Sequence, residues 1–361
     1  MERIFNFNAG PAVLPLEVLQ EVQRELLDYQ NTGMSILEMS HRSDEYEKIN
    51  AEAESDIKEL LGVGDDYCVL FMGGGASTQF SMVPLNFLPP DKSAGYIITG
   101  SFSDKAVEEA EKVGPTEIIF TSKPNKYNRV PQPEELVINP DLAYVHITGN
   151  NTIEGTEFFH YPETGKVPLI ADFSSDILSK ALDVNKFSLI YAGAQKNIGP
   201  GGVVVVIAKK DFLVGRAKTL PTMLNYEVHM KNRSLYNTPP VFGVYIVGKV
   251  VKWLKEQGGI ASIAALNKEK AQVIYDLIDT YPHFYRGYAE KDSRSLMNIT
   301  FGLPTKELEK RFAAEAEKQG MVGLLGHRSV GGLRASVYNA MPKAGCFALA
   351  EFMLKFYRDN K

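Results

Sequence analysis

Seven short apolar runs between residues 67 and 208 constrain the fold of this chain more than any other feature. They are YCVLF at 67, YIIT at 96, EIIF at 117, LAYVHI at 142, VPLIADF at 167, FSLIYA at 187 and GVVVVIA at 202. Several are almost continuously apolar, which is typical of strands covered on both faces by helices. Helical periodicity intervenes, as in SDKAVEEAEKV at 103–113. We therefore expect an α/β fold with a mostly parallel, seven-stranded sheet flanked by helices.

The pattern changes past residue 240. Two long helical stretches, VYIVGKVVKWLKEQGG and IASIAALNKEKAQVIYDLIDTY, are followed by SLMNITFGL, the helix KELEKRFAAEAEKQG, the strand GGLRASVY and an amphipathic helix from about 342 to 358. The chain has 361 residues, and single hydrophobic cores stop growing beyond roughly 250–300 residues. We therefore expect a large domain over 16–258 and a smaller α+β domain formed by 1–15 and 259–361.

The charge pattern argues against nucleic acid or a membrane as a partner. The net charge is −5, with acidic and basic residues mixed along the chain, so no basic field is available for a polyanion. No window reaches the roughly 18 apolar residues that span a bilayer, and the N-terminus lacks the pattern of a signal peptide. Cys68 and Cys346 both lie in apolar contexts and are expected to be buried thiols. These features predict a soluble, cytoplasmic protein with a small-molecule substrate.

Three features follow predicted strands at positions where ligands collect in such sheets. The stretch FMGGGASTQFSMV at 71–83 is a strand, a glycine-rich turn and a helix start, which can cradle an anion or be an ordinary tight turn. Asp172 ends the strand VPLIADF. An acidic residue at such a position is about as often a helix cap or a salt-bridge partner as it is a ligand partner. Lys196, in YAGAQKNIGPGG, is flanked by uncharged residues, and a solvated loop lysine is the alternative.

One cofactor needs all three features together. Pyridoxal phosphate carries a phosphate for a helix N-terminus, a pyridinium nitrogen for a carboxylate and an aldehyde that reacts with a lysine amine. Phe102, which follows the strand at 96, is placed to cover the ring. Thr152, in HITGNNTIEG, is placed to hydrogen-bond the phenolic oxygen of the ring. The sequence therefore predicts a pyridoxal phosphate site.

The motifs of this chain resemble those of the phosphoserine aminotransferases, within the class V aminotransferase group of the fold-type I pyridoxal phosphate enzymes. They span nearly the whole chain: NFNAGPAVLP at the start, MSILEMSHRS at 34, GGGASTQF at 73, NNTIEGTEF at 150, ADFSSDILS at 171, AGAQKNIGPGG at 192, NTPPVF at 237 and GHRSVGGLRASVYNAM at 326. So many motifs in order are specific, although any single one is weak.

The resemblance implies a role for each matching residue. Lys196 would be the lysine that bonds the cofactor, and Asp172 would pair with the pyridinium nitrogen. Ala76 and Ser77 would hold the phosphate, and Thr152 and Gln195 would contact the cofactor. Asn237 and Thr238 would reach the cofactor phosphate of a neighbouring subunit, which implies a homodimer with shared active sites. The family usually has tryptophan where this chain has Phe102, so stacking on the ring is expected to be weaker.

The resemblance also implies how substrates bind. Arg334 would grip the α-carboxylate, and the pairs His41-Arg42 and His327-Arg328 would bind the substrate phosphate or the distal carboxylate of glutamate. Guanidinium groups suit both anions, and dispersed surface arginines are the alternative. The implied reaction is amino transfer between phosphoserine with 2-oxoglutarate and 3-phosphohydroxypyruvate with glutamate, in serine biosynthesis and sometimes pyridoxine biosynthesis through 4-phosphohydroxy-L-threonine. The other histidines, His146, His160, His229 and His283, lack metal-ligand spacing, so no metal site is predicted.

Other functions remain open from the sequence. A cysteine desulfurase would need a reactive cysteine on an exposed loop, where neither Cys68 nor Cys346 is expected. A serine–glyoxylate type transaminase would share the lysine and the aspartate but not the two His-Arg pairs. A nucleotide-binding or regulatory module could use the GGGAS loop without catalysis, but it would leave Lys196 and Asp172 unexplained.

Overall fold

The computed structural model describes residues 3–215 and 219–361 and contains a central sheet of seven strands. In spatial order these are β2 (Tyr67–Met72), β10 (Val204–Lys209), β9 (Leu189–Gly193), β8 (Leu169–Asp172), β5 (Val145–Thr148), β3 (Ala94–Ile98) and β4 (Thr116–Thr121). Every neighbouring pair is parallel except those that β10 makes with β2 and β9. The predicted mostly parallel, seven-stranded sheet is confirmed.

The central strands are buried on both faces, as their apolar sequences predicted. Along β9, Ile190 packs into a core on one face of the sheet, whereas Leu189 and Tyr191 pack into a core on the other face. Along β10, Val205 packs into the same core as Ile190, and Val206 packs into the core on the other face. Because successive side chains of a strand point to opposite faces, a strand covered on both sides must be apolar throughout.

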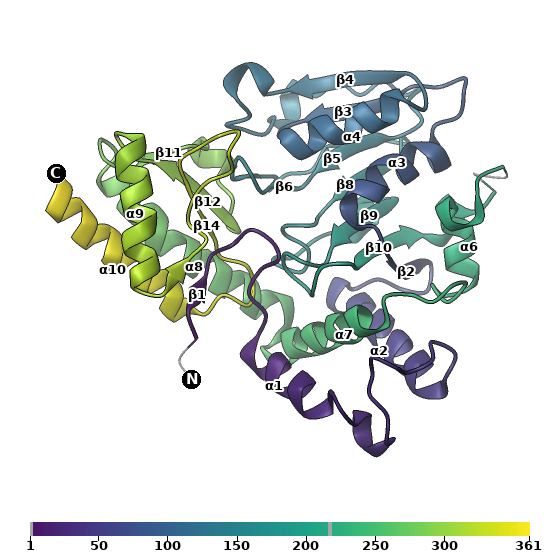
Figure 1. Ribbon diagram of the computed structural model, residues 1–361. Coiled ribbons are helices and arrows are strands. Elements are labelled where there is room, and N and C mark those ends of the chain that lie inside the picture. The colour runs from purple at the N-terminus through teal and green to yellow at the C-terminus, as the bar shows by residue number, and fades with distance from the viewer. Residues whose placement is uncertain (1–2, 216–218) are drawn as a thin grey trace.

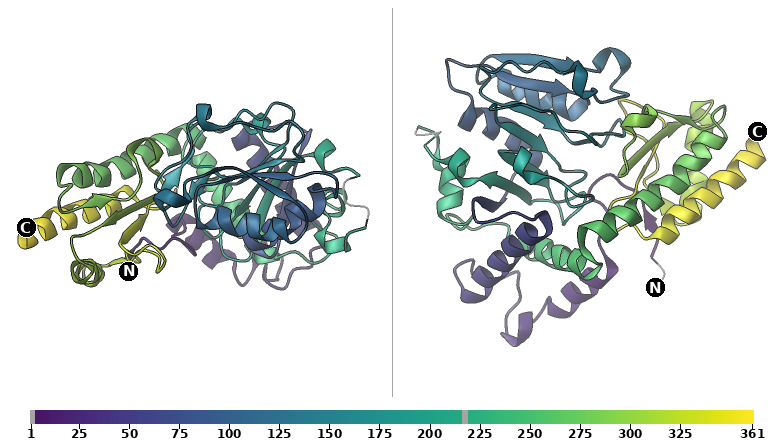
Figure 2. Two further views of the ribbon diagram at one scale, coloured as in Figure 1. Left: turned by 90° about the horizontal axis from the view of Figure 1, so that it is seen from above. Right: turned by 180° about the vertical axis from the view of Figure 1, so that it is seen from behind.

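Helices cover each face of this sheet (Figure 2). On one face lie α1 (Leu16–Glu25), α2 (Asp44–Leu61) and α7 (Val241–Glu256), and on the other lie α3 (Gly75–Phe87), α4 (Ser101–Glu111) and α6 (Tyr226–Lys231). The short helix α5 (Lys210–Leu213) follows β10. The predicted helix at 103–113 is α4, which begins two residues earlier. The expected α/β architecture is therefore present.

A smaller α+β unit lies beside the large sheet (Figure 1). Its antiparallel sheet has the order β11 (Arg286–Gly287), β12 (Asn298–Gly302) and β14 (Leu333–Ser336), and β1 (Phe5–Asn6) pairs in parallel with β13 (Met321–Val322). Its helices are α8 (Gly259–Thr280), α9 (Lys306–Lys318) and α10 (Lys343–Asn360). The last of these confirms the predicted C-terminal helix.

The core of the smaller unit includes Phe7 and Val13 from the N-terminal segment, so both ends of the chain meet there. Helix α8 joins the two parts, because Ile263 packs into a core of the large sheet and Ala271 packs into the small core. The division at 16–258, with 1–15 and 259–361 forming the second domain, stays a prediction. Within residues 3–215 and 219–361, no helix is long and apolar enough to cross a membrane.

Candidate active site

The predicted site residues follow strands that run in the same direction. Phe102 lies in the first turn of α4 after β3, Asp172 ends β8, and Lys196 comes three residues after the end of β9. Thr152 lies in the turn between the short strands β6 (Asn150–Asn151) and β7 (Thr156–Glu157), just after β5. Since parallel strands end at one edge of a sheet, the fold brings these residues together.

Lys196 is held by hydroxyl groups. Its Nζ donates to Thr152 Oγ1 at 2.7 Å and to Ser175 Oγ at 3.2 Å, and it lies 4.7 Å from the centroid of the Phe102 ring. Burial lowers the pKa of the Lys196 amine to about 8, against the opposing effect of the negative charge on Asp172. An amine in this state has an appreciable neutral, nucleophilic fraction near neutral pH.

Asp172 is a buried carboxylate at the sheet edge, 4% exposed. Its Oδ1 accepts a hydrogen bond from the backbone N–H of Ser174 at 2.8 Å, and the Ser174 hydroxyl in turn accepts from the N–H of Gly193 at 2.9 Å. Burial raises the pKa of Asp172, while the positive charge of Lys196 lowers it. No cation of the described residues forms an ion pair with Asp172, so this carboxylate could receive a positively charged group of a ligand.

Arg334 reaches the same place from β14 of the smaller unit. Its Nη1 donates to the backbone oxygen of Thr152 at 3.1 Å, while its Nε is buried without a hydrogen-bond partner in the described part of the chain. Burial lowers the pKa of the guanidinium, and the charge of Glu154 raises it. A buried, unsatisfied donor is costly, so this side chain suits an anionic ligand.

The glycine-rich loop follows β2 and leads into the N-terminus of α3. Gly74 has φ of +87°, a left-handed conformation that favours glycine. Ala76 and Ser77 lie in the first turn, where backbone N–H groups lack intrahelical partners. A cavity of about 310 Å³ adjoins this loop and is lined by, among others, Gly73, Gly74, Thr78, Asn237 and Thr238.

The first His-Arg pair lies near that cavity and makes no hydrogen bond or ion pair with Lys196, Asp172 or Arg334. Thr238 Oγ1 is 3.2 Å from His41 Nδ1, and the Nε of the exposed Arg42 is 3.5 Å from His41 Nε2. His41 and Thr238 of one and the same chain are therefore in contact.

The second His-Arg pair lies in the loop before β14. His327 Nδ1 is 2.7 Å from Ser329 Oγ, and burial lowers the pKa of His327, with further lowering by the charges of Arg334, Arg328 and Lys105. Gln195 is half-buried, and its backbone oxygen accepts from the N–H of Ala12 at 2.8 Å.

The arrangement of a half-buried lysine, a buried carboxylate and a half-buried arginine can be compared with that of known proteins. The profile of the aminotransferase class-V family matches residues 4–349. This chain belongs to the class-V aminotransferase family. It is 55% identical over 353 residues to a phosphoserine aminotransferase of Herpetosiphon aurantiacus, covering 98% of each chain. Its membership confirms the resemblance seen in the motifs.

Solved structures of class-V aminotransferases agree with this assignment. The phosphoserine aminotransferase of Bacillus circulans subsp. alkalophilus superposes with a TM-score of 0.98 at 53% identity, covering 100% of both chains. A phosphoserine aminotransferase from Trichomonas vaginalis, described as bound to PLP, has a TM-score of 0.92 at 36% identity, covering 98% of this chain and 100% of that one. The chain therefore has the fold of the fold-type I pyridoxal phosphate enzymes.

The structure adds residues that the sequence analysis of this class-V aminotransferase missed. Ser175 bridges Lys196 and Thr152, with its Oγ 2.5 Å from Thr152 Oγ1. Glu154 is fully buried. It accepts a hydrogen bond from the backbone N–H of Ser101 at 2.9 Å and another from the Ser101 hydroxyl at 2.5 Å. Ser101 is the first residue of α4, the helix that carries Phe102. In the sequence, the only signal for Ser175 is the pair of serines that follows Asp172 and Phe173.

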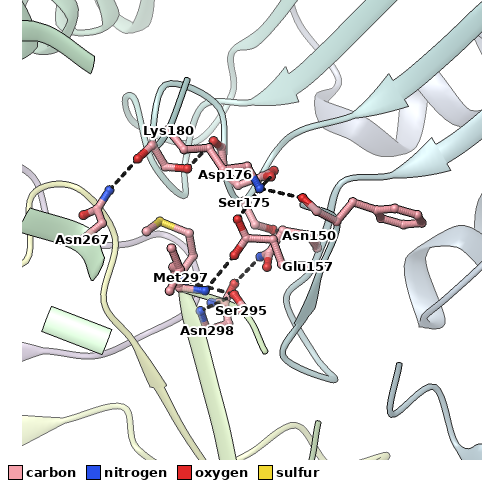
Figure 3. A network of polar contacts seen from close by, with 12 residues as sticks. Asn150, Glu157, Ser175, Asp176, Lys180, Asn267, Ser295, Met297 and Asn298 are labelled. Atoms are coloured by element: carbon pink, nitrogen blue, oxygen red, sulfur yellow. Dashed lines mark hydrogen bonds and ion pairs between the residues drawn. The ribbon is translucent and has the colours of Figure 1, made fainter. Parts of the chain in front are cut away.

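A buried polar network supports the loop after Asp172 (Figure 3). Lys180 forms an ion pair with Glu157 and donates to the backbone oxygen of Phe158 at 2.8 Å. Glu157 Oε2 accepts from the N–H of Leu296 at 2.7 Å, two residues before β12 of the smaller unit. Asn267 donates to the backbone oxygen of Ser179 at 3.0 Å. The loop that carries Ser175 is thus fixed to both parts of the molecule.

Both cysteines are buried, as predicted, which argues against a cysteine desulfurase. Burial raises the pKa of the Cys68 thiol to about 11 and that of Cys346 to about 12. A thiol with a raised pKa is a poor nucleophile because little thiolate forms. Within residues 3–215 and 219–361, no group of three or more His, Cys, Asp or Glu side chains could hold a metal ion.

Proposed function

We propose that this chain is a pyridoxal phosphate-dependent phosphoserine aminotransferase. It would transfer the amino group reversibly between O-phospho-L-serine with 2-oxoglutarate and 3-phosphohydroxypyruvate with L-glutamate. The observation that carries the proposal is the contact of Thr152 with both Lys196 and Arg334, because it joins a reactive amine to a group that binds a carboxylate. The names of relatives above 50% identity give the substrate.

The described residues fit the cofactor. Lys196 is a partly buried amine with a pKa of about 8, and Asp172 is a buried carboxylate without an ion-pair partner in the described chain. The half-buried Phe102 offers its ring beside Lys196 Nζ. Bound pyridoxal phosphate would supply an aldehyde that condenses with amines and a ring that withdraws electrons from the substrate Cα–H bond. Ala76, Ser77, Asn237 and Thr238 would hold its phosphate, and Gln195 would contact it.

The protein's own groups would place and move the proton. With a pKa of about 8, the Lys196 amine would take the proton from the substrate Cα and hold it at Nζ for its return later in the reaction. Thr152 and Ser175 hold this amine at the sheet edge through the hydrogen bonds described above. The Asp172 carboxylate would keep a ring nitrogen protonated, because its charge favours a cation in a buried site.

The substrate's negative charges would be divided among basic groups. Arg334, with its unsatisfied Nε, would bind the α-carboxylate that all substrates share. The pairs His327-Arg328 and His41-Arg42 would bind the phosphate of phosphoserine or the distal carboxylate of glutamate. A phosphate favours guanidinium partners because it offers several oxygen acceptors and up to two negative charges.

The active sites would be shared within a homodimer. The family resemblance implies that Asn237 and Thr238 would reach the cofactor phosphate of the neighbouring subunit. Because His41 contacts Thr238 within one chain, His41 and Arg42 would then reach the same neighbouring site. We further propose that the enzyme works in the cytoplasm, in serine biosynthesis and, where 4-phosphohydroxy-L-threonine is a substrate, in pyridoxine biosynthesis.

A comparison of amino donors tests the proposed function. The purified enzyme, loaded with cofactor, is mixed with phosphoserine or with serine, and keto-acid formation from each is followed separately. Phosphoserine should react with a specificity constant at least tens of times greater, because serine lacks the group that the His-Arg pairs bind. Equal reaction of both donors would favour a serine–glyoxylate type transaminase. Borohydride reduction and peptide mapping should label Lys196, and a label on another lysine would overturn its assignment.

A further inference from the structure

The first turns of α4 carry a second lysine beside the Phe102 ring. Lys105 follows Phe102 by three positions, so the two side chains lie on one face of the helix. Lys105 Nζ is 5.4 Å from the centroid of the Phe102 ring, and Lys196 Nζ is 4.7 Å from the same centroid. Lys105 is exposed, whereas Lys196 is partly buried. One aromatic ring is therefore shared by the reactive amine and a solvent-facing ammonium group.

Among the described residues, Lys105 has no counter-ion, although acids flank it on α4. Asp104 pairs with Lys123 at 3.0 Å and accepts from Tyr127, and Glu109 pairs with Lys112 at 2.6 Å. No carboxylate in the described part of the chain lies within 4 Å of Lys105 Nζ. Glu108, three positions after Lys105, forms no ion pair with it either. A lysine without an ion pair in the described part of the chain is available to an external anion.

The loop that carries His327 also carries a cation, Arg328. The charge of Lys105 is close enough to contribute, with Arg334 and Arg328, to the lowered pKa of His327, although burial is the largest cause. The exposed Arg328 likewise makes no ion pair with any described residue. Lys105 comes from the large sheet's side, and its charge acts on His327 of the smaller unit, which is next to the cation Arg328.

We propose that Lys105 binds the side-chain phosphate of the substrate and helps to select phosphoserine over substrates with a single distal charge. This proposal rests on the proposed function and extends its substrate site by one residue that the family motifs did not indicate. A phosphate can be dianionic and offers three terminal oxygens, whereas the distal carboxylate of glutamate has two oxygens and one charge. A further cation beside Arg328 therefore favours the phosphate more.

The test compares Lys105→Gln with Lys112→Gln, which removes the same charge from the other end of α4. For Lys105→Gln, the specificity constant for phosphoserine should fall about tenfold and that for glutamate only about threefold, in line with the lower end of what a hydrogen bond to a charged group contributes. The loss should appear in KM, with kcat nearly unchanged, because Lys105 does not touch the reacting atoms. Lys112→Gln should leave both substrates unaffected, and Lys105→Arg should retain most of the phosphoserine activity.

A binding measurement gives a readout independent of turnover. Calorimetric titration of the cofactor-loaded enzyme with 3-phosphoglycerate, which has a phosphate and a carboxylate but no amino group to transfer, should show about tenfold weaker binding for Lys105→Gln only. If the unmodified enzyme prefers phosphoserine but Lys105→Gln behaves like Lys112→Gln in both measurements, the role of Lys105 is overturned and the proposed function stands. If the unmodified enzyme does not prefer phosphoserine over serine, the proposed function itself fails, and the selectivity ascribed to Lys105 fails with it.

Discussion

Lys196 Nζ donates a hydrogen bond to Thr152 Oγ1 at 2.7 Å, and no carboxylate in the described part of the chain lies within 4 Å of it. A hydroxyl oxygen stabilises an ammonium ion less than a carboxylate does, so burial dominates and lowers the pKa of Lys196 to about 8 from an ordinary 10.5. The nearby negative charge of Asp172 opposes this shift. The protonation state of Lys196 therefore changes close to neutral pH.

The first prediction concerns the pH dependence of cofactor attachment. Only the neutral amine is nucleophilic, so the rate at which the cofactor-free enzyme bonds pyridoxal phosphate should rise with pH, with a midpoint near 8. In Asp172→Asn the midpoint should move lower, because the negative charge that favours the ammonium form is lost. Rapid-mixing absorbance at a series of pH values measures both. A midpoint near the ordinary pKa of lysine would contradict the role of burial.

The second prediction tests Asp172 in catalysis. Asp172→Asn should fold and bind cofactor more weakly, and kcat should fall by at least two orders of magnitude, on the scale expected when a buried charged partner is lost. Circular dichroism and urea unfolding check the fold, and steady-state assays measure kcat. Ser174→Ala, which removes a hydroxyl near Asp172 but leaves the carboxylate, is the control. Turnover near the normal level in Asp172→Asn would refute its pairing with the ring nitrogen.

The sequence predicted those parts of the molecule that depend on local pattern or on the chemistry of one ligand. Continuous apolar runs such as VVVV at 203–206 require a strand covered on both faces, and both faces are covered. Pyridoxal phosphate requires a lysine and a carboxylate, which directed attention to Lys196 and Asp172. The direction of β10 was not predictable, because an apolar strand pairs in either direction.

Contacts between the two parts of the chain could not be predicted either. Arg334 and Thr152 are 182 positions apart, and the bond between them depends on how the two sheets are oriented. The ion pair between Lys180 and Glu157 looks in the sequence like two ordinary surface charges. Burial distinguishes such a pair from solvated charges, and burial here follows from the packing of the smaller unit against the loop after β8.

The third prediction concerns that ion pair. Lys180→Met should lower the free energy of unfolding by about 3–5 kcal/mol, because it leaves the fully buried Glu157 carboxylate without its cation. Lys186→Met breaks a pair with the exposed Glu163 and should cost at most about 1 kcal/mol. Urea unfolding at neutral pH measures both. Similar losses in the two variants would mean that Lys180 does not act as a buried counter-ion.

The fourth prediction separates the site for the substrate's α-carboxylate from the site for its phosphate. Arg42→Ala should lower the specificity constant for phosphoserine by one to two orders of magnitude, since a hydrogen bond to a charged group contributes roughly 1.5–3 kcal/mol. The loss for glutamate should be smaller, and that for serine smallest. Arg334→Ala should instead reduce all three alike, because they share the α-carboxylate. Separate half-reaction rates measure this, and equal losses for phosphoserine and serine in Arg42→Ala would exclude the phosphate assignment.

The fifth prediction tests whether active sites are shared between subunits. Lys196→Ala removes the reactive amine and Arg42→Ala removes a substrate contact, so homodimers of either variant should have little activity. If Arg42 acts on the neighbouring site, a mixed dimer has one site with both defects and one site with neither, because the intact Lys196 and the intact Arg42 then meet. Differently tagged chains are co-expressed, and the doubly tagged dimer is purified and assayed with phosphoserine. The activity of the mixed dimer should be about half that of the unmodified dimer. Activity no greater than the mean of the two variant homodimers would mean that each chain supplies its own Arg42. Thr238, which contacts His41 in the same chain, would then also be reassigned to the site of its own chain.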